Sequence, residues 1–233
     1  MIKLPLPAIP VAACMFAVHL LAADFWQTKP FTEWNDKDVQ KLLQSSPWAR
    51  PITVAMSGGP GAANSGGLDG FSGLGAHKSI HPGDAAAPGA GSVVLIVRWQ
   101  SAKPVREAVI KARFGNEAGT SAEARKALEE PVDHYIISIC GLPSTAFGGN
   151  AEEFRQQMLA QGMLVIKGKD PIKPVDFTTE DTGHSAQGMF VFPKTDPITE
   201  DDKEVEFIVK IRDTSIRQKF HVKEMLYNGK LDL

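Results

Sequence analysis

Val93-Val94-Leu95-Ile96-Val97 is an uninterrupted run of five aliphatic residues, and this stretch decides the fold. A short continuous apolar run is typical of a strand that lies inside a sheet and is covered on both faces. We therefore expect a central strand here. The chain has 233 residues, of which 43% are hydrophobic and 22% charged, and this is enough to build a sizeable core around that strand.

Alternating helix and strand signals follow this run. The first helix is expected to begin at Ser101–Pro104, because proline is tolerated in a first helical turn, and to end at Gly115. The later signals predict a helix after Ser121 that stops before Pro131, a strand over Tyr135–Cys140, a helix from the capping box Asn150/Glu153 to Gly162, and a strand over Met163–Ile166. This order predicts a βαβ-like unit over 92–167.

The C-terminal third is rich in strand signals. Apolar and charged residues alternate with period two over Val205–Ile211, and the alternation resumes over Ile216–Val222 after a turn. Asn228-Gly229 between two short apolar runs predicts a tight hairpin. The fold class predicted is α+β: a mixed β-sheet with a βαβ-like central part packed by helices, and an antiparallel C-terminal hairpin region.

An aromatic-rich helix is predicted near the start of the domain. Asn35 is a good N-cap, and Asp38 stands three residues later, where it completes a capping box. Trp34 and Val39 are spaced as a hydrophobic staple around that cap. The helix should stop before Pro47.

Residues 57–92 differ in character from the rest of the chain. They are dominated by glycine and alanine, and such a segment buries too little apolar surface to offset its ordering entropy. We expect a long disordered loop here, after a short strand near Ile52–Ala55. His77, His81 and Asp84 are close enough in sequence to share a metal ion, but a flexible segment disfavours a preformed site, so no metal or cofactor is predicted.

The first residues are laid out like a secretory signal. Residues 1–23 combine a positive start at Lys3, an apolar stretch over Val11–Leu21, and small residues up to Ala23. We expect export and cleavage near Ala23, which leaves one α+β domain over 24–233, located in the periplasm or secreted. No transmembrane span is expected in this mature chain, since the apolar stretch is shorter than the roughly 20 residues that a membrane requires.

Two alternatives for the first residues stay open. Val11-Ala12-Ala13-Cys14 resembles a lipobox, in which Cys14 would be lipidated and anchor the protein, although an apolar leader would then remain where lipoproteins normally have a polar tether. The other alternative is a buried N-terminal helix. Signal cleavage leaves Cys140 as the last cysteine, so no internal disulfide is predicted.

Charge and short motifs exclude several classes of function. The formal net charge of −2 provides no basic field for a phosphate backbone, so nucleic-acid binding is not expected. Asp181-Thr182-Gly183 is similar to the aspartic-protease signature, yet polar residues precede it, and a polar hairpin loop explains it equally well. Cys140 with His134 as its base fails on geometry, because six residues of one strand separate them by roughly 20 Å.

Three segments carry a resemblance to a known group of proteins. They are Trp34 with Ser46-Pro47-Trp48-Ala49, the run Arg98–Ala102 with Pro104–Ala108, and Lys219-Phe220 together with Gly229 to Leu233. In these segments the chain resembles a family of uncharacterised exported proteins from soil bacteria. The resemblance implies export and a single domain. It implies no activity and transfers no functional residue.

The expected function is a non-catalytic, exported interaction module that binds a partner protein or an envelope component. The candidate contact residues are Trp26, Trp34, Trp48 and Phe71, because aromatic side chains and a long loop often carry recognition. The alternative for the tryptophans is that they dock on the core. Two further functions stay open: a hydrolase of envelope or extracellular polymers with a site assembled from distant residues, and a structural subunit of an oligomer.

The signal predicts a defined new N-terminus. When the full chain is produced in a bacterial host, intact-mass spectrometry of the exported protein should show a chain that begins at or near Asp24. A lipid-modified chain that begins at Cys14 would establish the lipoprotein alternative. An uncleaved chain that remains in the cytoplasm would contradict export.

Overall fold

The computed structural model describes residues 24–55, 92–147, 150–181 and 185–233. The predicted signal with Cys14, the Gly/Ala-rich segment up to residue 91 with Phe71 and the candidate metal ligands His77, His81 and Asp84, and Thr182-Gly183 lie outside these residues. Helices occupy α1 Phe25–Thr28, α2 Asp36–Gln44, α3 Lys103–Phe114, α4 Ala122–Glu129 and α5 Ala151–Gln161. Strands occupy β1 Ala49–Ala55, β2 Ser92–Trp99, β3 His134–Leu142, β4 Met163–Ile166, β5 Asp176–Asp181, β6 Ala186–Pro193, β7 Glu204–Ile211, β8 Thr214–His221, β9 Leu226–Tyr227 and β10 Lys230–Leu231.

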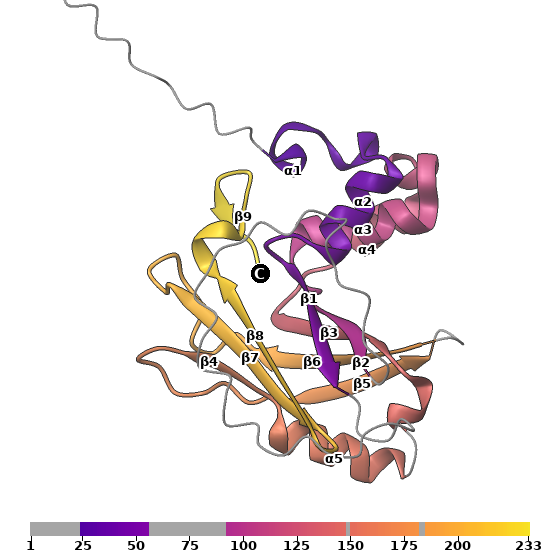
Figure 1. Ribbon diagram of the computed structural model, residues 1–233. Coiled ribbons are helices and arrows are strands. Elements are labelled where there is room, and N and C mark those ends of the chain that lie inside the picture. Colours follow the sequence, from indigo (N-terminus) through magenta and orange to yellow (C-terminus); the bar gives the residue numbers. More distant parts are fainter. Residues whose placement is uncertain (1–23, 56–91, 148–149, 182–184) are drawn as a thin grey trace, which may run out of the picture.

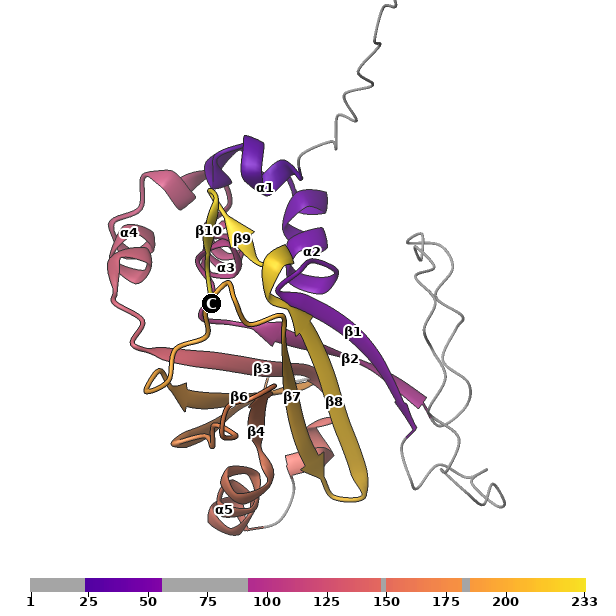
Figure 2. The same ribbon diagram turned by 90° about the vertical axis from the view of Figure 1, so that its left-hand side faces the viewer.

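The α+β class is confirmed, but the described strands form two main sheets and a small hairpin where one mixed sheet was predicted. One sheet has the order β1-β2-β3-β6-β5, the second has the order β4-β7-β8, and β9 pairs with β10. Every pairing between these strands is antiparallel. In Figures 1 and 2 the long β7–β8 hairpin crosses over one face of the larger sheet, so the two sheets enclose the core between them.

The apolar run 93–97 lies in strand β2, but its environment differs from the prediction. β2 is second in the sheet order, and its buried residues alternate: Leu95, Val97 and Trp99 are fully buried, whereas Val94 is 43% exposed. One face of the strand is therefore covered, not both. β2 also pairs antiparallel with β3, so α3 and α4 form an excursion at the end of the sheet and not a parallel βαβ crossover.

Aromatic side chains fill the space between the two sheets. Phe190 and Phe192 of β6 meet Phe207 of β7, with ring centroids 5.3 and 6.2 Å apart and the ring planes steeply inclined. Trp99 of β2 reaches Phe220 of β8 in the same way, with ring centroids 5.5 Å apart. All five side chains are fully buried. Edge-to-face packing adds to the hydrophobic contribution of such rings, so this layer joins the sheets.

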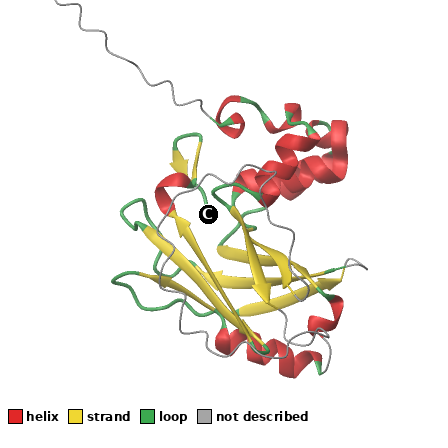
Figure 3. Ribbon diagram, viewed as in Figure 1, coloured by secondary structure: helices red, strands yellow, loops and turns green. Residues whose placement is uncertain are grey.

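The helices gather at the two ends of the sheets (Figures 1 and 3). α1–α4 lie at one end and α5 at the other. The predicted starts of α2, α4 and α5 are confirmed: Asn35 and Asp38 form the capping box of α2, the Ser121 side chain caps α4, and the Asn150 side chain caps α5. Gly115 ends α3 with a φ of 55°, a conformation that favours glycine.

The C-terminal hairpin also follows the sequence signal. Asn228 and Gly229 have φ values of 51° and 74°, as a two-residue turn with two left-handed positions requires. β9 and β10 flank this turn, and the hairpin lies beside α1 in Figure 2. Among the described residues, no helix is long and apolar enough to cross a membrane.

Loss of one ring at the sheet interface should destabilise the whole fold. Phe207→Ala is expected to lower the free energy of unfolding by about 3–5 kcal/mol, because it removes a fully buried ring and leaves a cavity. The control Val175→Ala truncates a side chain that is 55% exposed and should change stability by less than about 0.5 kcal/mol. Urea denaturation followed by tryptophan fluorescence measures both. Equal stabilities would contradict the structural role of the aromatic layer.

Candidate functional site

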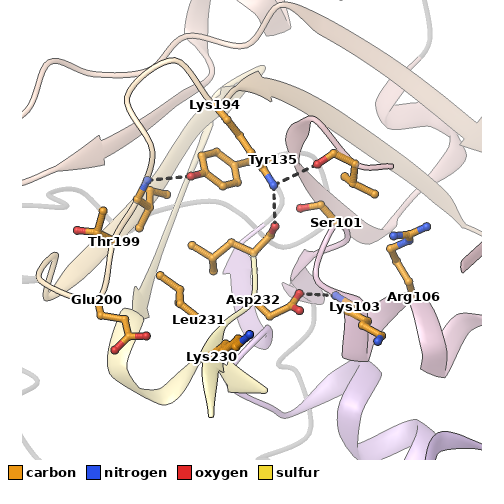
Figure 4. A pocket seen from close by; sticks show the side chains of 13 residues that line it. Ser101, Lys103, Arg106, Tyr135, Lys194, Thr199, Glu200, Lys230, Leu231 and Asp232 are labelled. Atoms are coloured by element: carbon orange, nitrogen blue, oxygen red, sulfur yellow. Dashed lines mark hydrogen bonds between the residues drawn. The ribbon is translucent and has the colours of Figure 1, made fainter. Parts of the chain in front are cut away.

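The candidate site is a pocket of about 600 Å³ at the end of the sheets that carries α1–α4. Its walls come from four segments: residues 101–106 at the start of α3, 132–135 at the start of β3, 194–200 after β6, and 230–233. Figure 4 shows side chains from all four segments around one hollow. Its volume is within the range of small-molecule sites in proteins.

The inner wall of the pocket consists of three polar side chains. Tyr135 and Ser101 are 3% and 5% exposed, and each hydroxyl oxygen accepts a backbone N–H. Ile198 N donates to Tyr135 Oη at 2.8 Å, and Ile136 N donates to Ser101 Oγ at 3.0 Å. The Lys194 ammonium stands 4.8 Å from the centroid of the Tyr135 ring. A cation over an aromatic face is a favourable contact.

Lys194 also joins two separate segments of the chain. Its ammonium donates to the main-chain oxygens of Val132 at 3.3 Å and Leu233 at 3.2 Å. Burial lowers the pKa of Lys194, because desolvation disfavours the charged amine.

The segment after β6 is held by a second lysine. The Lys169 ammonium donates to the Pro197 carbonyl and to Asp202 Oδ2, each at 3.0 Å. The same Asp202 oxygen accepts the Thr199 N–H at 2.8 Å. These bonds fix the backbone that presents Ile198, Thr199 and Glu200 to the pocket.

Residues 230–233 are anchored from distant parts of the sequence. The Trp48 indole N–H donates to the Asp232 carbonyl at 2.8 Å, and the Lys103 backbone N–H donates to Asp232 Oδ1 at 2.6 Å. The Asp232 carboxylate thus caps α3, whose own N-cap residue Ala102 has no capping side chain. Burial raises the pKa of Asp232, although the Lys103 N–H opposes this shift.

A buried glutamate reinforces the same wall. Tyr227 of β9 donates its hydroxyl proton to Glu107 Oε2 of α3 at 2.5 Å, and Glu107 is 5% exposed. Burial raises the pKa of the Glu107 carboxyl, and burial together with the adjacent Glu107 carboxyl raises the pKa of Tyr227. This bond ties the C-terminal hairpin to α3 and so keeps residues 230–233 in place.

Arg106 borders the pocket, but its guanidinium is bound to the end of a helix. Its guanidinium donates to the carbonyls of Ala127, Leu128 and Glu130 at 2.5, 3.3 and 3.0 Å. These carbonyls lie at the C-terminal end of α4, where the helix lacks internal donors. Arg106 also borders a second pocket of about 400 Å³, which shares Ser101 with the first.

No protein-family model matches the chain. Searches of curated proteins and of solved structures find no match either. The function is therefore inferred from the geometry of the site.

The three tryptophans singled out from the sequence are core side chains in this structure. Trp26, Trp34 and Trp48 are 4%, 2% and 0% exposed, so they offer a partner almost no surface. This burial corrects the prediction that the three tryptophans contact a partner. It agrees with the alternative that they dock on the core. The physical reason is mutual packing: Trp26 stacks edge to face on Phe25 at 4.9 Å and on Trp48 at 6.0 Å.

The remaining sequence candidates do not form a catalytic group among the described residues. His134 is exposed, whereas Cys140 is half-buried, and the Cys140 thiol lies 3.5 Å from Gln187 Oε1. Asp181 ends β5, which pairs with β6 as a hairpin, and it accepts a hydrogen bond from the Ser144 hydroxyl at 3.2 Å. No group of three or more potential metal ligands occurs in the described residues.

No sequence motif marks the pocket, because its walls lie far apart along the chain. The sequence predicts a helix start at Ser101 and places Asp232 in the C-terminal hairpin region. Lys194 and Tyr135 carried no signal that distinguishes them from a surface lysine and a strand tyrosine. Pro193, the last residue of β6, is the one local feature that marks where this strand ends.

The Glu107–Tyr227 pair should produce a measurable pH dependence of stability. Since burial raises the pKa of folded Glu107 above its usual 4.5, its contribution is fully present below that pH and is lost as the pH rises through the folded pKa. Glu107→Gln keeps an acceptor for Tyr227 without the charge. The free energy of unfolding of the wild type should therefore fall relative to that of Glu107→Gln as the pH rises above 4.5.

Urea denaturation at a series of pH values measures this difference. Glu123→Gln is the matched control, because it removes a carboxylate from the surface of α4. A wild type that gains stability over Glu107→Gln as the pH rises would show that the folded protein favours the ionised carboxylate.

Proposed function

We propose that this protein is an exported, non-catalytic binding module of the bacterial cell envelope, and that the pocket beside α3 is its binding site. The observation that carries the proposal is the built inner wall, where two nearly buried hydroxyls and a half-buried lysine face one hollow. Such convergent polar groups in a concave site are typical of ligand binding. The secretory layout of residues 1–23 and the resemblance to exported proteins of soil bacteria support the location.

The described residues favour binding over catalysis. Two of the six histidines lie in this part of the chain, His134 and His221, and both are exposed. His221 pairs with Glu204 at 3.7 Å, and neither histidine is hydrogen-bonded to a serine, threonine or cysteine. General-base activation of a nucleophile requires such contact.

A blocked pocket should abolish specific capture of a partner from the envelope. Glu200 is an exposed pocket residue, so Glu200→Trp should place an indole at the mouth without disturbing the core. The neighbouring Asp201 is also exposed but does not line the pocket, and Asp201→Trp is the matched control. In crosslinking affinity capture from native envelopes, Glu200→Trp should lower the yield of bound component at least tenfold, and Asp201→Trp should not.

A third variant without residues 58–90 tests the segment that contains Phe71. If this variant loses capture and Glu200→Trp does not, the binding site lies in that segment. Equal capture by all variants would show that the pocket is not the binding site.

One observation favours the hydrolase as a second candidate. Glu200 and Asp232 line the same pocket, and burial raises the pKa of Asp232, as a general acid requires. Against it, one Asp232 oxygen already accepts the Lys103 N–H. Incubation of the protein with purified envelope polymers decides: soluble fragments that appear with the wild type and disappear with both Glu200→Gln and Asp232→Asn would establish the hydrolase.

A further inference from the structure

We propose that the outer face of the five-stranded sheet binds a basic amphipathic helix of a partner protein. This face is turned away from the second sheet, and its apolar strip consists of Val94, Ile96, Ile136, Met189 and Val191. None of these five residues lines the pocket beside α3, so the proposal does not depend on that pocket.

The alternation of the strands places the strip on the outer face. Leu95 of β2, Ile137 of β3 and Phe190 of β6 are fully buried in the core, so the residues on either side of each point the other way. The register joins the three strands, since Ile136 stands opposite Val191. The strip therefore runs without interruption from β2 across β3 to β6.

No described element packs along this strip. Its five side chains belong to neither core cluster and are not packed against one. Val94 is 43% exposed, and the other four are partly exposed. An antiparallel sheet with one face on the core normally carries polar residues on the other face. A contiguous apolar strip there is typical of an interaction surface.

The size of the strip fits one helix. It spans two strand spacings from β2 to β6, about 10 Å, and extends for about 20 Å along the strands. An α-helix with its side chains is about 10–12 Å across. A stable dimer would bury roughly 800 Å² on each copy of the chain, which is more than so narrow a strip offers. A single helix therefore covers it better than a second copy does.

The carboxylates around the strip select a basic partner. Glu130 and Asp133 line a hollow of about 400 Å³ at one end of the strip, and Ile136 and Val191 line it as well. Glu180 of β5 borders the strip on the same face. None of these three carboxylates forms an ion pair with another described residue. A lysine or arginine can lay its aliphatic stem on the apolar part of the hollow and place its charge beside the carboxylates.

The other charged groups on this side are already engaged. Arg98 donates from Nε to the Leu43 carbonyl at 3.0 Å, and Arg106 donates to the carbonyls at the end of α4. Asp176 is paired with Arg155 at 2.7 Å. The charge that remains for a partner is therefore negative, and opposite charge at the border of an apolar contact gives specificity.

A peptide titration followed by NMR tests the proposal on the full chain. The probe is a short helical peptide with leucine on one face and lysine on the other. It should move the amide signals of Ile96, Ile136 and Val191 in a saturable way. The same peptide with glutamate in place of every lysine should bind at least about tenfold more weakly.

Substitutions assign the binding to the strip. Val94→Asp adds a charge at an exposed position, so the fold should survive, and binding of the lysine peptide should weaken at least about tenfold. Ile208→Asp is the matched control, because Ile208 is a partly exposed residue on the outer face of β7 in the other sheet. Joint replacement of Glu130 by Gln and Asp133 by Asn should remove the preference for the lysine peptide.

Four results would overturn the proposal. They are unchanged signals of the strip, equal binding of the two peptides, an effect of Ile208→Asp as large as that of Val94→Asp, and binding that occurs only in a variant without residues 58–90. The last result would show that a segment of this chain, and not a partner, occupies the strip. Movement of the same signals with protein concentration alone would replace the partner helix by a second copy.

Discussion

The contact between the two sheets is the constraint on which the rest of the structure depends. Phe190 and Phe192 of β6 pack against Phe207 of β7, and these rings are fully buried. The contact between these buried rings fixes the relative position of the sheets, because a well-packed interior tolerates little displacement. It therefore also fixes where β6 ends and where β7 begins. Lys194 and the segment up to residue 203 span that gap, so the aromatic layer determines where one wall of the pocket stands.

The opposite wall depends on polar bonds between residues that are distant in sequence. Trp48 and Lys103 both hold Asp232, and Tyr227 holds Glu107. The Trp48 side chain and the Glu107–Tyr227 pair are buried, which is the circumstance in which a hydrogen bond is costly to lose. The wall is thus stabilised by the same atoms that give it a defined shape. A site built in this way is preorganised, and preorganisation reduces the ordering cost of binding.

Local structure was predictable wherever a signal acts over a few residues. The cap at Asn35, the helix end at Gly115 and the turn at Asn228-Gly229 each depend on near neighbours, and each was found at its expected place. Strand pairing was not predictable in this way. The order of strands and helices over 92–167 is compatible with parallel or antiparallel pairing of β2 and β3, and only the tertiary arrangement decides between them. The hydrogen bond from the buried Trp48 indole likewise goes to Asp232, which lies 184 residues away.

The pocket could not be predicted from the sequence for a further physical reason. Recognition motifs are detectable when the groups that bind a ligand are close in sequence, as in phosphate-binding loops. Here Ser101, Tyr135 and Lys194 lie on three separate segments, and each carries out a structural task as well. Ser101 and Tyr135 accept backbone N–H groups, and Lys194 bridges two main-chain oxygens. What they share is that tertiary packing brings all three to one pocket. Ligand binding there would favour the folded state, because only that state brings the three segments together.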